Sequence, residues 1–248
     1  SAIPTLTTSR RIPGLNFHYN KKNKLVYHKT FTEGIKYFSG FKLLRERLCR
    51  DMEKECPDLV ITDFEPSLPR AARKMGIPFI SLNHQFFLNA YDLTGLPIEL
   101  QFHGAYLGGA AGLFYSGQEE TIISAFFFPG LKKGFEHVKQ VGVMLRKEII
   151  ELQPENRGHI TAYLRKFAYN SVLESLENCG REVRIYGTGE RESYKNLKFF
   201  KTDGQRFIDD LASSSILVTT AGNQIVGEAL YLGKPILGIP EPGNFEQF

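Results

Sequence analysis

The chain has 248 residues, of which 42% are hydrophobic and 23% charged, and its formal net charge is only +4. This composition is typical of a globular protein with a buried core and excludes a disordered or low-complexity chain. Because the basic residues are scattered along the chain, no nucleic-acid partner is expected. The length fits either one large domain or two modest ones.

Cys49, Cys56 and Cys179 are widely spaced and form neither a metal-ligand nor a disulfide pattern. This cysteine usage fits a reducing, cytoplasmic compartment. No apolar run approaches the roughly 18–20 residues that span a bilayer. The apolar, glycine-rich stretch 107–114 is predicted to be a mobile loop. The alternative for this stretch is peripheral contact with lipid at the inner face of the membrane.

The first half of the chain contains one clear βαβ unit. Hydrophobic periodicity predicts a helix at 43–54, a strand at 58–62, a helix at 68–75 and a strand at 78–82. Residues 1–24 lack the strand and glycine-rich turn with which a doubly wound domain normally opens. The first domain is therefore expected to be incomplete at its start.

Two polar side chains follow the predicted strands of this unit. Asp63 ends the first strand and His84 follows the second, so both are expected at the carboxyl edge, where open α/β sheets bind ligands. His84 is a candidate for acceptor binding or proton transfer, and the alternative is a histidine that only orders the loop. Asp63 is a candidate to orient an acceptor or a histidine, or to cap the next helix.

An aromatic run at 126–128, followed by Pro129 and Gly130, marks the predicted domain junction. We expect a first domain over residues 1–128 and a second over residues 129–248. The three phenylalanines are interpreted as packing between the domains. The second domain is expected to be truncated at its end, because the chain stops after a polar cluster that should begin a helix.

The second half alternates short apolar runs with helical patterns, which is typical of a parallel sheet wrapped by crossover helices. Strands are predicted at 159–164, 182–186, 196–200, 216–219 and 235–239. Helices are predicted at 171–178, around 207–211 and at 224–232. These repeated βα units indicate an α/β protein with a doubly wound domain.

A glycine turn between a buried strand and a helix is the strongest chemical signal. Ala221, Gly222, Asn223 and Gln224 open the helix, whose free amides and positive dipole end suit a pyrophosphate. Glu228 lies about one and a half turns further on and can accept two hydrogen bonds from vicinal ribose hydroxyls. The alternative is an exposed helix glutamate.

A polar cluster returns to the ligand edge at the end of the chain. Asn244, Glu246 and Gln247 carry donors and acceptors that suit the hydroxyls of a transferred sugar. The alternative for Gln247 is a helix cap. Together with the glycine turn, this cluster predicts a nucleotide-sugar site.

These segments resemble a known superfamily in order and spacing. The matching segments are 207–212, 218–222, 228–230, 233–235 and 245–247, with 141–146 at the entry to the second domain. They resemble the peptidoglycan-precursor N-acetylglucosaminyltransferase and related GT-B enzymes, of the glycosyltransferase family 28/1-like type. Segments 63–66, 76–78 and 83–85 are similar to a less characterised bacterial and archaeal group within that superfamily.

The resemblance implies a GT-B fold, with two facing Rossmann-like, doubly wound domains and a cleft between them. It implies that Arg146 contacts a donor phosphate, Gly222 and its neighbours the diphosphate, Glu228 the ribose, and Glu246 with Gln247 the sugar. It implies neither a metal nor another cofactor, because the helix dipole and basic side chains stabilise the departing diphosphate. The family's usual base is a histidine in an amino-terminal glycine-rich loop, which residues 1–24 lack.

The predicted activity is the inverting transfer of a hexose or N-acetylhexosamine from a uridine diphosphate (UDP) sugar to a glycan or lipid-linked acceptor. One alternative is a non-hydrolysing nucleotide-sugar epimerase, which would bind the same donor without an acceptor. Another is a binding protein that keeps the donor pocket and has lost catalysis. The residues leave these alternatives open.

Overall fold

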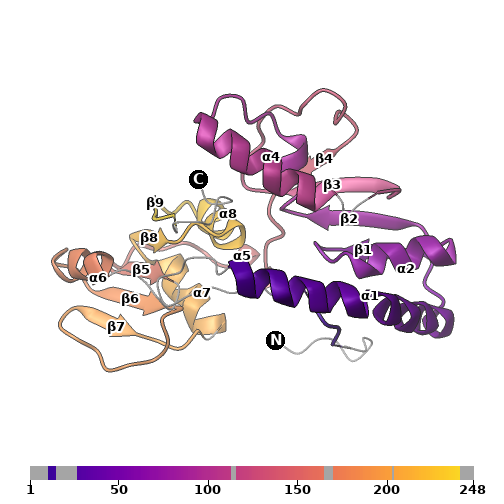
Figure 1. Cartoon of the computed structure of the whole chain (residues 1–248). Helices are drawn as coiled ribbons and strands as arrows, with labels where there is room; N and C mark the ends of the chain where they lie inside the picture. The colour runs from indigo at the N-terminus through magenta and orange to yellow at the C-terminus, as the bar shows by residue number, and fades with distance from the viewer. Residues whose placement is uncertain (1–10, 15–26, 113–115, 165–169, 203, 241–248) are drawn as a thin grey trace.

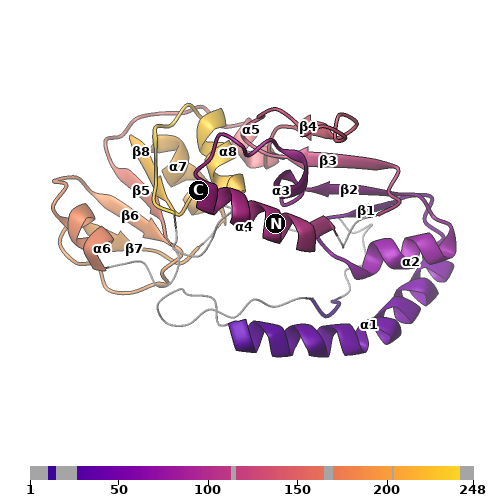
Figure 2. The same cartoon turned by 45° about the horizontal axis from the view of Figure 1, so that its top comes forward.

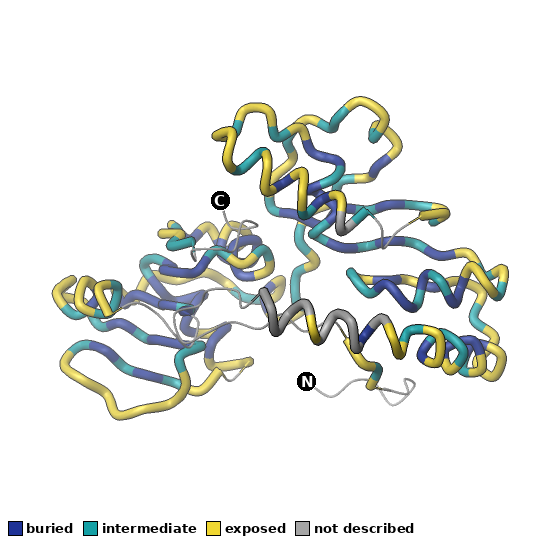
Figure 3. The backbone as a smooth tube through the Cα atoms, viewed as in Figure 1, coloured by how far each residue is buried: buried dark blue, intermediate teal, exposed yellow. Residues whose placement is uncertain are grey.

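The computed structural model describes residues 11–14, 27–112, 116–164, 170–202 and 204–240. Two α/β units lie side by side, and each is built on its own parallel sheet (Figure 1). Buried residues are concentrated in the inner strands of both sheets, whereas edge strands such as β4 and β9 are mostly exposed (Figure 3). The predicted α/β class and Rossmann-like architecture are confirmed.

The first sheet has four parallel strands in the order β1-β2-β3-β4. They are β1 (Val60–Thr62), β2 (Phe79–Asn83), β3 (Glu120–Ser124) and β4 (Lys139–Val141). In the described part of the chain, each new strand is therefore added on the same side. Strands β3 and β4 were not among the elements that the hydrophobic pattern predicted.

The helices of the first unit form two groups against this sheet. Helices α1 (Tyr27–Glu55) and α2 (Ser67–Met75) share a hydrophobic cluster with β1 and β2. Helices α3 (Phe87–Ala90) and α4 (Ile98–Gly112) lie toward the β3 end, where α3 packs in a second cluster with Ile123. In Figure 1, α1 lies below the sheet and α4 above it, and the two helices also lie apart in Figure 2.

The glycine-rich stretch 107–114 is helical in its described part, because residues up to Gly112 belong to α4. The loop prediction is wrong there. A Cβ at Gly108 would lie 2.8 Å from the Leu88 carbonyl oxygen, and one at Gly112 would lie 2.9 Å from the Asn89 side-chain nitrogen. Asn89 Nδ2 also donates to the Gly108 carbonyl at 2.6 Å. The glycines thus let α4 approach α3 closely.

The second sheet has five parallel strands in the order β7-β6-β5-β8-β9. They are β5 (Ile160–Tyr163), β6 (Val183–Tyr186), β7 (Leu197–Phe199), β8 (Ile216–Thr219) and β9 (Ile236–Gly238). In chain order, β6 and β7 are added on one side of β5, and β8 and β9 are then added on its other side. This reversal is the topological switch point at which doubly wound sheets bind ligands.

Helices cover both faces of this second sheet. Helices α7 (Gly204–Ser213) and α8 (Asn223–Tyr231) share one core cluster, which also contains Ile149 of the short helix α5 (Lys147–Ile150). Helix α6 (Asn170–Glu177) contributes to the cluster that contains Val183, Ile185 and Val218. Among the described residues of this unit, every helix and strand except α5 corresponds to an element predicted from the sequence.

The boundary expected between residues 128 and 129 lies too early. β4 pairs in parallel with β3, with Ser124 opposite Val141, so residues 129–141 belong to the first unit. Gly142 to Arg146 then link the two units, since Ile149 already lies in the second core. A parallel strand can follow its neighbour only after a crossover connection, and this one contains no helix that hydrophobic periodicity would reveal.

The aromatic run at 126–128 contacts both units. Phe126 packs against the core cluster of the second unit. Phe127 lies 6.1 Å from Phe87 and 5.6 Å from Tyr91, measured between ring centroids, and both partners belong to the first unit. Phe128 is exposed. Phe126 therefore packs between the units, as the sequence indicates, whereas Phe127 packs on residues of the first unit.

Candidate functional site

The amino end of α8 lies directly after β8, at the switch point of the second sheet. Gly222 caps the helix in an extended conformation, with φ −68° and ψ 140°, and has no side chain to occupy the first free amides. Ala221 adopts a left-handed φ of 59°, which is uncommon for a residue with a side chain. This local strain turns the chain sharply enough to present the helix start at the carboxyl edge.

Several buried polar atoms at the strand ends and helix start have no hydrogen-bond partner among the described residues. They are Thr188 Oγ1 after β6, Thr219 Oγ1 at the end of β8, and Asn223 Oδ1 at the start of α8. Buried polar groups without partners are rare in folded proteins and mark places where a polar ligand or water can bind. The two threonine hydroxyls can donate to an anion, whereas Asn223 Oδ1 only accepts and suits a hydroxyl or a water.

Arg146 and Glu228 form a bidentate ion pair that joins the linker to α8. Arg146 Nε lies 2.7 Å from Glu228 Oε1, and Nη2 lies 2.6 Å from Oε2. Gln224 Nε2 donates to the same Oε1 at 2.8 Å. The hydrogen bonds to Glu228 raise the pKa of Arg146 above its ordinary value. The Glu228 side chain is only 1% exposed, so the alternative of an exposed helix glutamate is wrong.

One face of α8, between Gln224 and Glu228, packs against the linker. Gln224 Nε2 donates to the Met144 carbonyl at 2.9 Å. A Cβ at Gly227 would lie 2.5 Å from a Val143 methyl carbon, so this position requires glycine. Gln224, Gly227 and Glu228 recur at the spacing of one helix face. The helix that carries the candidate donor site thus also fixes the linker.

His84 is connected to α8 through one backbone carbonyl. His84 Nδ1 lies 3.2 Å from the Ser124 carbonyl oxygen, and Asn223 Nδ2 donates to the same oxygen at 3.0 Å. A carbonyl only accepts hydrogen bonds, so Nδ1 carries the proton and the second ring nitrogen, Nε2, keeps its lone pair in the neutral ring. Burial lowers the pKa of His84 below its ordinary value, which favours the neutral form.

Asp63 lies at the end of β1 and does not cap α2. The amides of Ser67 and Leu68 donate to the Glu65 carboxylate at 3.0 and 2.7 Å, so the capping alternative for Asp63 is wrong. Phe64 has a left-handed φ of 45°, and this turn displays Asp63 at the exposed carboxyl edge. Desolvation raises the pKa of Asp63 above its ordinary value. Its role toward an acceptor remains a prediction.

The remaining predicted site residues divide into two groups. Asn244, Glu246 and Gln247 lie outside the described residues. Five predicted residues are brought together by hydrogen bonds at the linker or at the amino end of α8: His84, Arg146, Asn223, Gln224 and Glu228. The roles of all these residues toward a ligand remain predictions.

Sequence reasoning missed Ser124, whose carbonyl joins His84 to Asn223. The signal that could have found it is the β-branched run Thr121-Ile122-Ile123, which precedes it and is typical of a buried strand. Ser124 then follows the same rule as Asp63 and His84, because it ends a parallel strand at the carboxyl edge.

Lys234, in the resemblance segment 233–235, supports the fold at the opposite edge of the sheet. Its Nζ donates to the carbonyl oxygens of Glu155 and Ser214. The side chain is buried, and this burial lowers the pKa of Lys234 below its ordinary value. Lys234, although part of the resemblance, therefore stabilises the fold and does not face the candidate site.

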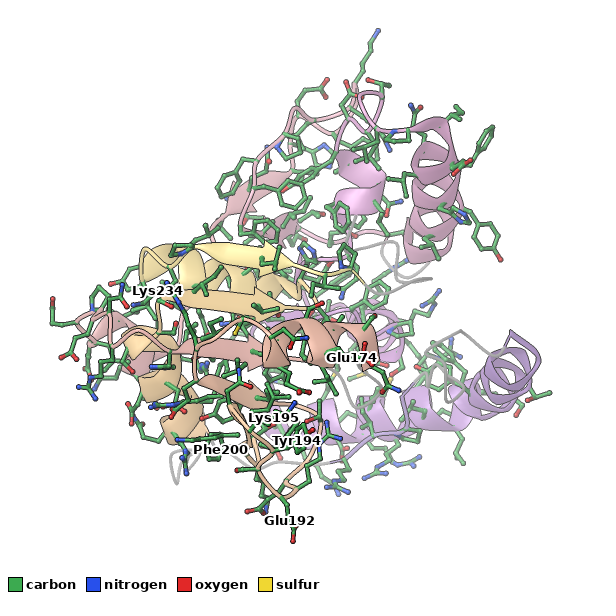
Figure 4. All side chains as sticks on the ribbon, turned by 90° about the vertical axis from the view of Figure 1, so that its left-hand side faces the viewer. Glu174, Glu192, Tyr194, Lys195, Phe200 and Lys234 are labelled. Atoms are coloured by element: carbon green, nitrogen blue, oxygen red, sulfur yellow. The ribbon has the colours of Figure 1, made fainter. Side chains whose placement is uncertain are left out.

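Two grooves of about 310 Å³ lie elsewhere on the second unit. One is lined by Arg157, Arg184 and Asp209. The other is lined by Glu174, Glu192 and Tyr194, which gather on one flank of the unit (Figure 4). Neither groove includes the amino end of α8. Among the described residues, no cluster of three or more histidine, cysteine or acidic side chains is placed to bind a metal, and no helix is long and apolar enough to cross a bilayer.

Comparison with solved structures places this arrangement among the GT-B glycosyltransferases. Phytolacca americana UGT2, solved with UDP-2-fluoro-glucose and pterostilbene, has a TM-score of 0.59 and 14% identity, covering 88% of this chain and 64% of that one. The calicheamicin glycosyltransferase CalG4 has a TM-score of 0.54 and 15% identity, covering 86% and 64%. At these identities the likeness defines the fold.

Residues 5–248 match the family described as glycosyl transferase family 1, and the chain belongs to this family. An uncharacterized glycosyltransferase of Methanosarcina mazei is 24% identical over 246 residues, covering 87% of this chain and 61% of the relative. The chain thus spans less than two thirds of the length of these relatives. The finer resemblance to the peptidoglycan-precursor enzyme stays a prediction.

Proposed function

We propose that this glycosyltransferase transfers a hexose or N-acetylhexosamine from a UDP-sugar to a glycan or lipid-linked acceptor, with inversion at the anomeric carbon. The observation that carries the proposal is the amino end of α8, whose first amides have no side-chain cap. It lies at the switch point, beside buried polar atoms that have no hydrogen-bond partner among the described residues. The UDP-2-fluoro-glucose in the similarly folded plant enzyme is further support for a uridine diphosphate donor.

In this proposal the diphosphate binds at the turn formed by Ala221, Gly222 and the first amides of α8. Free amides and the helix dipole stabilise the negative charge that develops as UDP leaves. Arg146 supplies a cation within reach of the same helix, and no metal is required. Glu228 accepts hydrogen bonds from the ribose, while Asn244, Glu246 and Gln247 bind the transferred sugar.

His84 acts as the base in the proposed reaction. Its Nε2 has a free lone pair, because Nδ1–H donates to the Ser124 carbonyl. Nε2 accepts the proton of an acceptor hydroxyl, and the oxygen attacks the anomeric carbon from the side opposite UDP. A new C–O bond forms while the bond to UDP breaks, and UDP leaves with the electron pair. Asp63, at the neighbouring strand end, orients the acceptor.

Product analysis tests the proposed activity. The chain is incubated with a panel of UDP-sugars and a mixture of glycan and lipid-linked acceptors, and the products are separated by mass spectrometry. We expect a glycosylated acceptor and free UDP. An epimerised nucleotide sugar without any acceptor product would instead identify the epimerase. Tight binding of UDP without turnover of any donor would identify a binding protein that lacks catalysis.

A further inference from the structure

The ion pair between Arg146 and Glu228 occupies the edge of the carboxylate that a ribose would use. The guanidinium donates from two nitrogens to two different carboxylate oxygens, at 2.7 and 2.6 Å. Two vicinal ribose hydroxyls would also need one oxygen each to bind in a bidentate manner. Because Gln224 takes a further position on Oε1, the arginine and the diol cannot both bind the carboxylate in this way.

The burial of Arg146 and Glu228 also indicates that the ion pair blocks a ribose from the carboxylate. The Glu228 side chain is 1% exposed, whereas that of Arg146 is 37% exposed. A ligand that approaches from solvent therefore meets the guanidinium before the carboxylate. Arg146 has an extended backbone just before α5, outside any regular element, so its side chain can change partner without breaking a helix or a strand.

We propose that the donor opens this ion pair, and that the exchange makes the site selective for a nucleoside diphosphate over a nucleoside. The inference rests on the proposed function, in which Glu228 binds the ribose. As the two ribose hydroxyls take the carboxylate, the guanidinium loses its counter-ion and pairs with the diphosphate. Arg146 is thus a specificity-determining residue as well as a phosphate ligand.

In the proposed exchange, tight binding needs both parts of the donor. A nucleoside supplies the hydroxyls but no anion, so its binding leaves the guanidinium without a counter-ion. A nucleoside diphosphate supplies both, and a guanidinium forms strong, bidentate hydrogen bonds with phosphate. Removing the arginine should therefore have opposite effects on the two ligands.

The test measures the affinities of uridine and UDP for the wild-type chain and for Arg146→Met by NMR titration and calorimetry. Without its cation, the buried carboxylate gains more from the ribose hydroxyls, so uridine should bind about two- to fivefold more tightly. UDP should bind roughly tenfold more weakly or worse. The control is Arg157→Met, which removes an exposed arginine that pairs with Glu155 in the same unit and should leave both affinities unchanged.

The pattern of affinities separates the outcomes. Equal weakening of uridine and UDP by Arg146→Met, in a variant with a wild-type melting temperature, would overturn the exchange and leave a purely structural pair. Weaker UDP binding with unchanged uridine binding would also overturn it, because Arg146 would then contact phosphate without competing for Glu228. If the wild-type chain binds neither ligand, it is the proposed function that fails.

Discussion

Single side chains at the ends of parallel strands carry the proposed chemistry, and His84 has the most specific surroundings. Its Nδ1 faces the Ser124 carbonyl, which defines the tautomer, and burial lowers its pKa. A lowered pKa keeps the ring neutral, and so able to accept a proton, at pH values below the ordinary histidine pKa of about 6.5. Activity should therefore hold at neutral pH and fall only when the pH drops through this lowered pKa.

The variant His84→Asn tests this role, because its Nδ2 can take the place of Nδ1 and donate to the Ser124 carbonyl, but it cannot take a proton. We expect kcat to fall about 100-fold or more, the usual contribution of a general base, and the acidic limb of the pH profile to disappear. The affinity for UDP should not change. Full activity with an unaltered pH profile would assign His84 to ordering the loop.

The candidate site residues at strand ends were predictable from the sequence, whereas the residues with which they form hydrogen bonds and ion pairs were not. Asp63, His84 and the glycine turn could be found because each follows a β-branched or apolar run. The pairing of Arg146 with Glu228 could not be found, since it joins residues 82 positions apart and depends on how the linker lies along α8. For Asp63, the competing cap from Glu65 becomes visible only in the structure.

Among the single elements, helix α4 stands out because it presents an exposed apolar face. Ile98, Phe102 and Tyr106 are 61%, 71% and 78% exposed, and their spacing of four residues places them on one side of the helix. The opposite side carries the glycines that approach α3. An exposed apolar face of this kind can bind a lipid surface, so we expect the lipid contact considered for the stretch 107–114 to involve this face of α4 instead.

Co-sedimentation with vesicles of mixed neutral and anionic lipids tests this contact. The wild-type chain should pellet with the vesicles, and the double variant Phe102→Ser with Tyr106→Ser should pellet at least several-fold less while its melting temperature is unchanged. A matched double variant on the second unit, Tyr194→Ser with Tyr231→Ser, removes two other exposed aromatic side chains and should bind as the wild type does. Equal binding of all three proteins would exclude α4 as the contact.

Elements differ in how clearly the sequence predicts them. In the second unit, alternating apolar strands and amphipathic helices follow closely enough for periodicity to identify them. In the first unit, the pattern predicts a loop at 107–114, where the end of α4 lies, because glycine normally disfavours a helix interior. Its close contact with α3 outweighs that preference, and such contacts between distant segments are invisible in a local pattern.

The whole molecule is a member of glycosyl transferase family 1 with the GT-B fold, and its two units are joined by a linker that packs on α8. Three linker residues, Val143, Met144 and Arg146, contact α8. The fold class was predictable because both units repeat βα elements. The boundary was not, because β4 is a three-residue strand with an exposed, polar pattern, and its membership in the first sheet follows only from pairing with β3.

The central claim is that the amino end of α8 binds the donor diphosphate, and calorimetric titration of UDP into the wild-type chain and Gly222→Ala tests it most directly. A Cβ at Gly222 would meet only an Ile225 methyl carbon at 3.9 Å, and its backbone angles are accessible to alanine, so folding should be unaffected. We predict that the variant melts at the wild-type temperature but binds UDP roughly tenfold more weakly, because the new methyl group blocks approach to the helix amides. Wild-type affinity for UDP in the folded variant would contradict the claim.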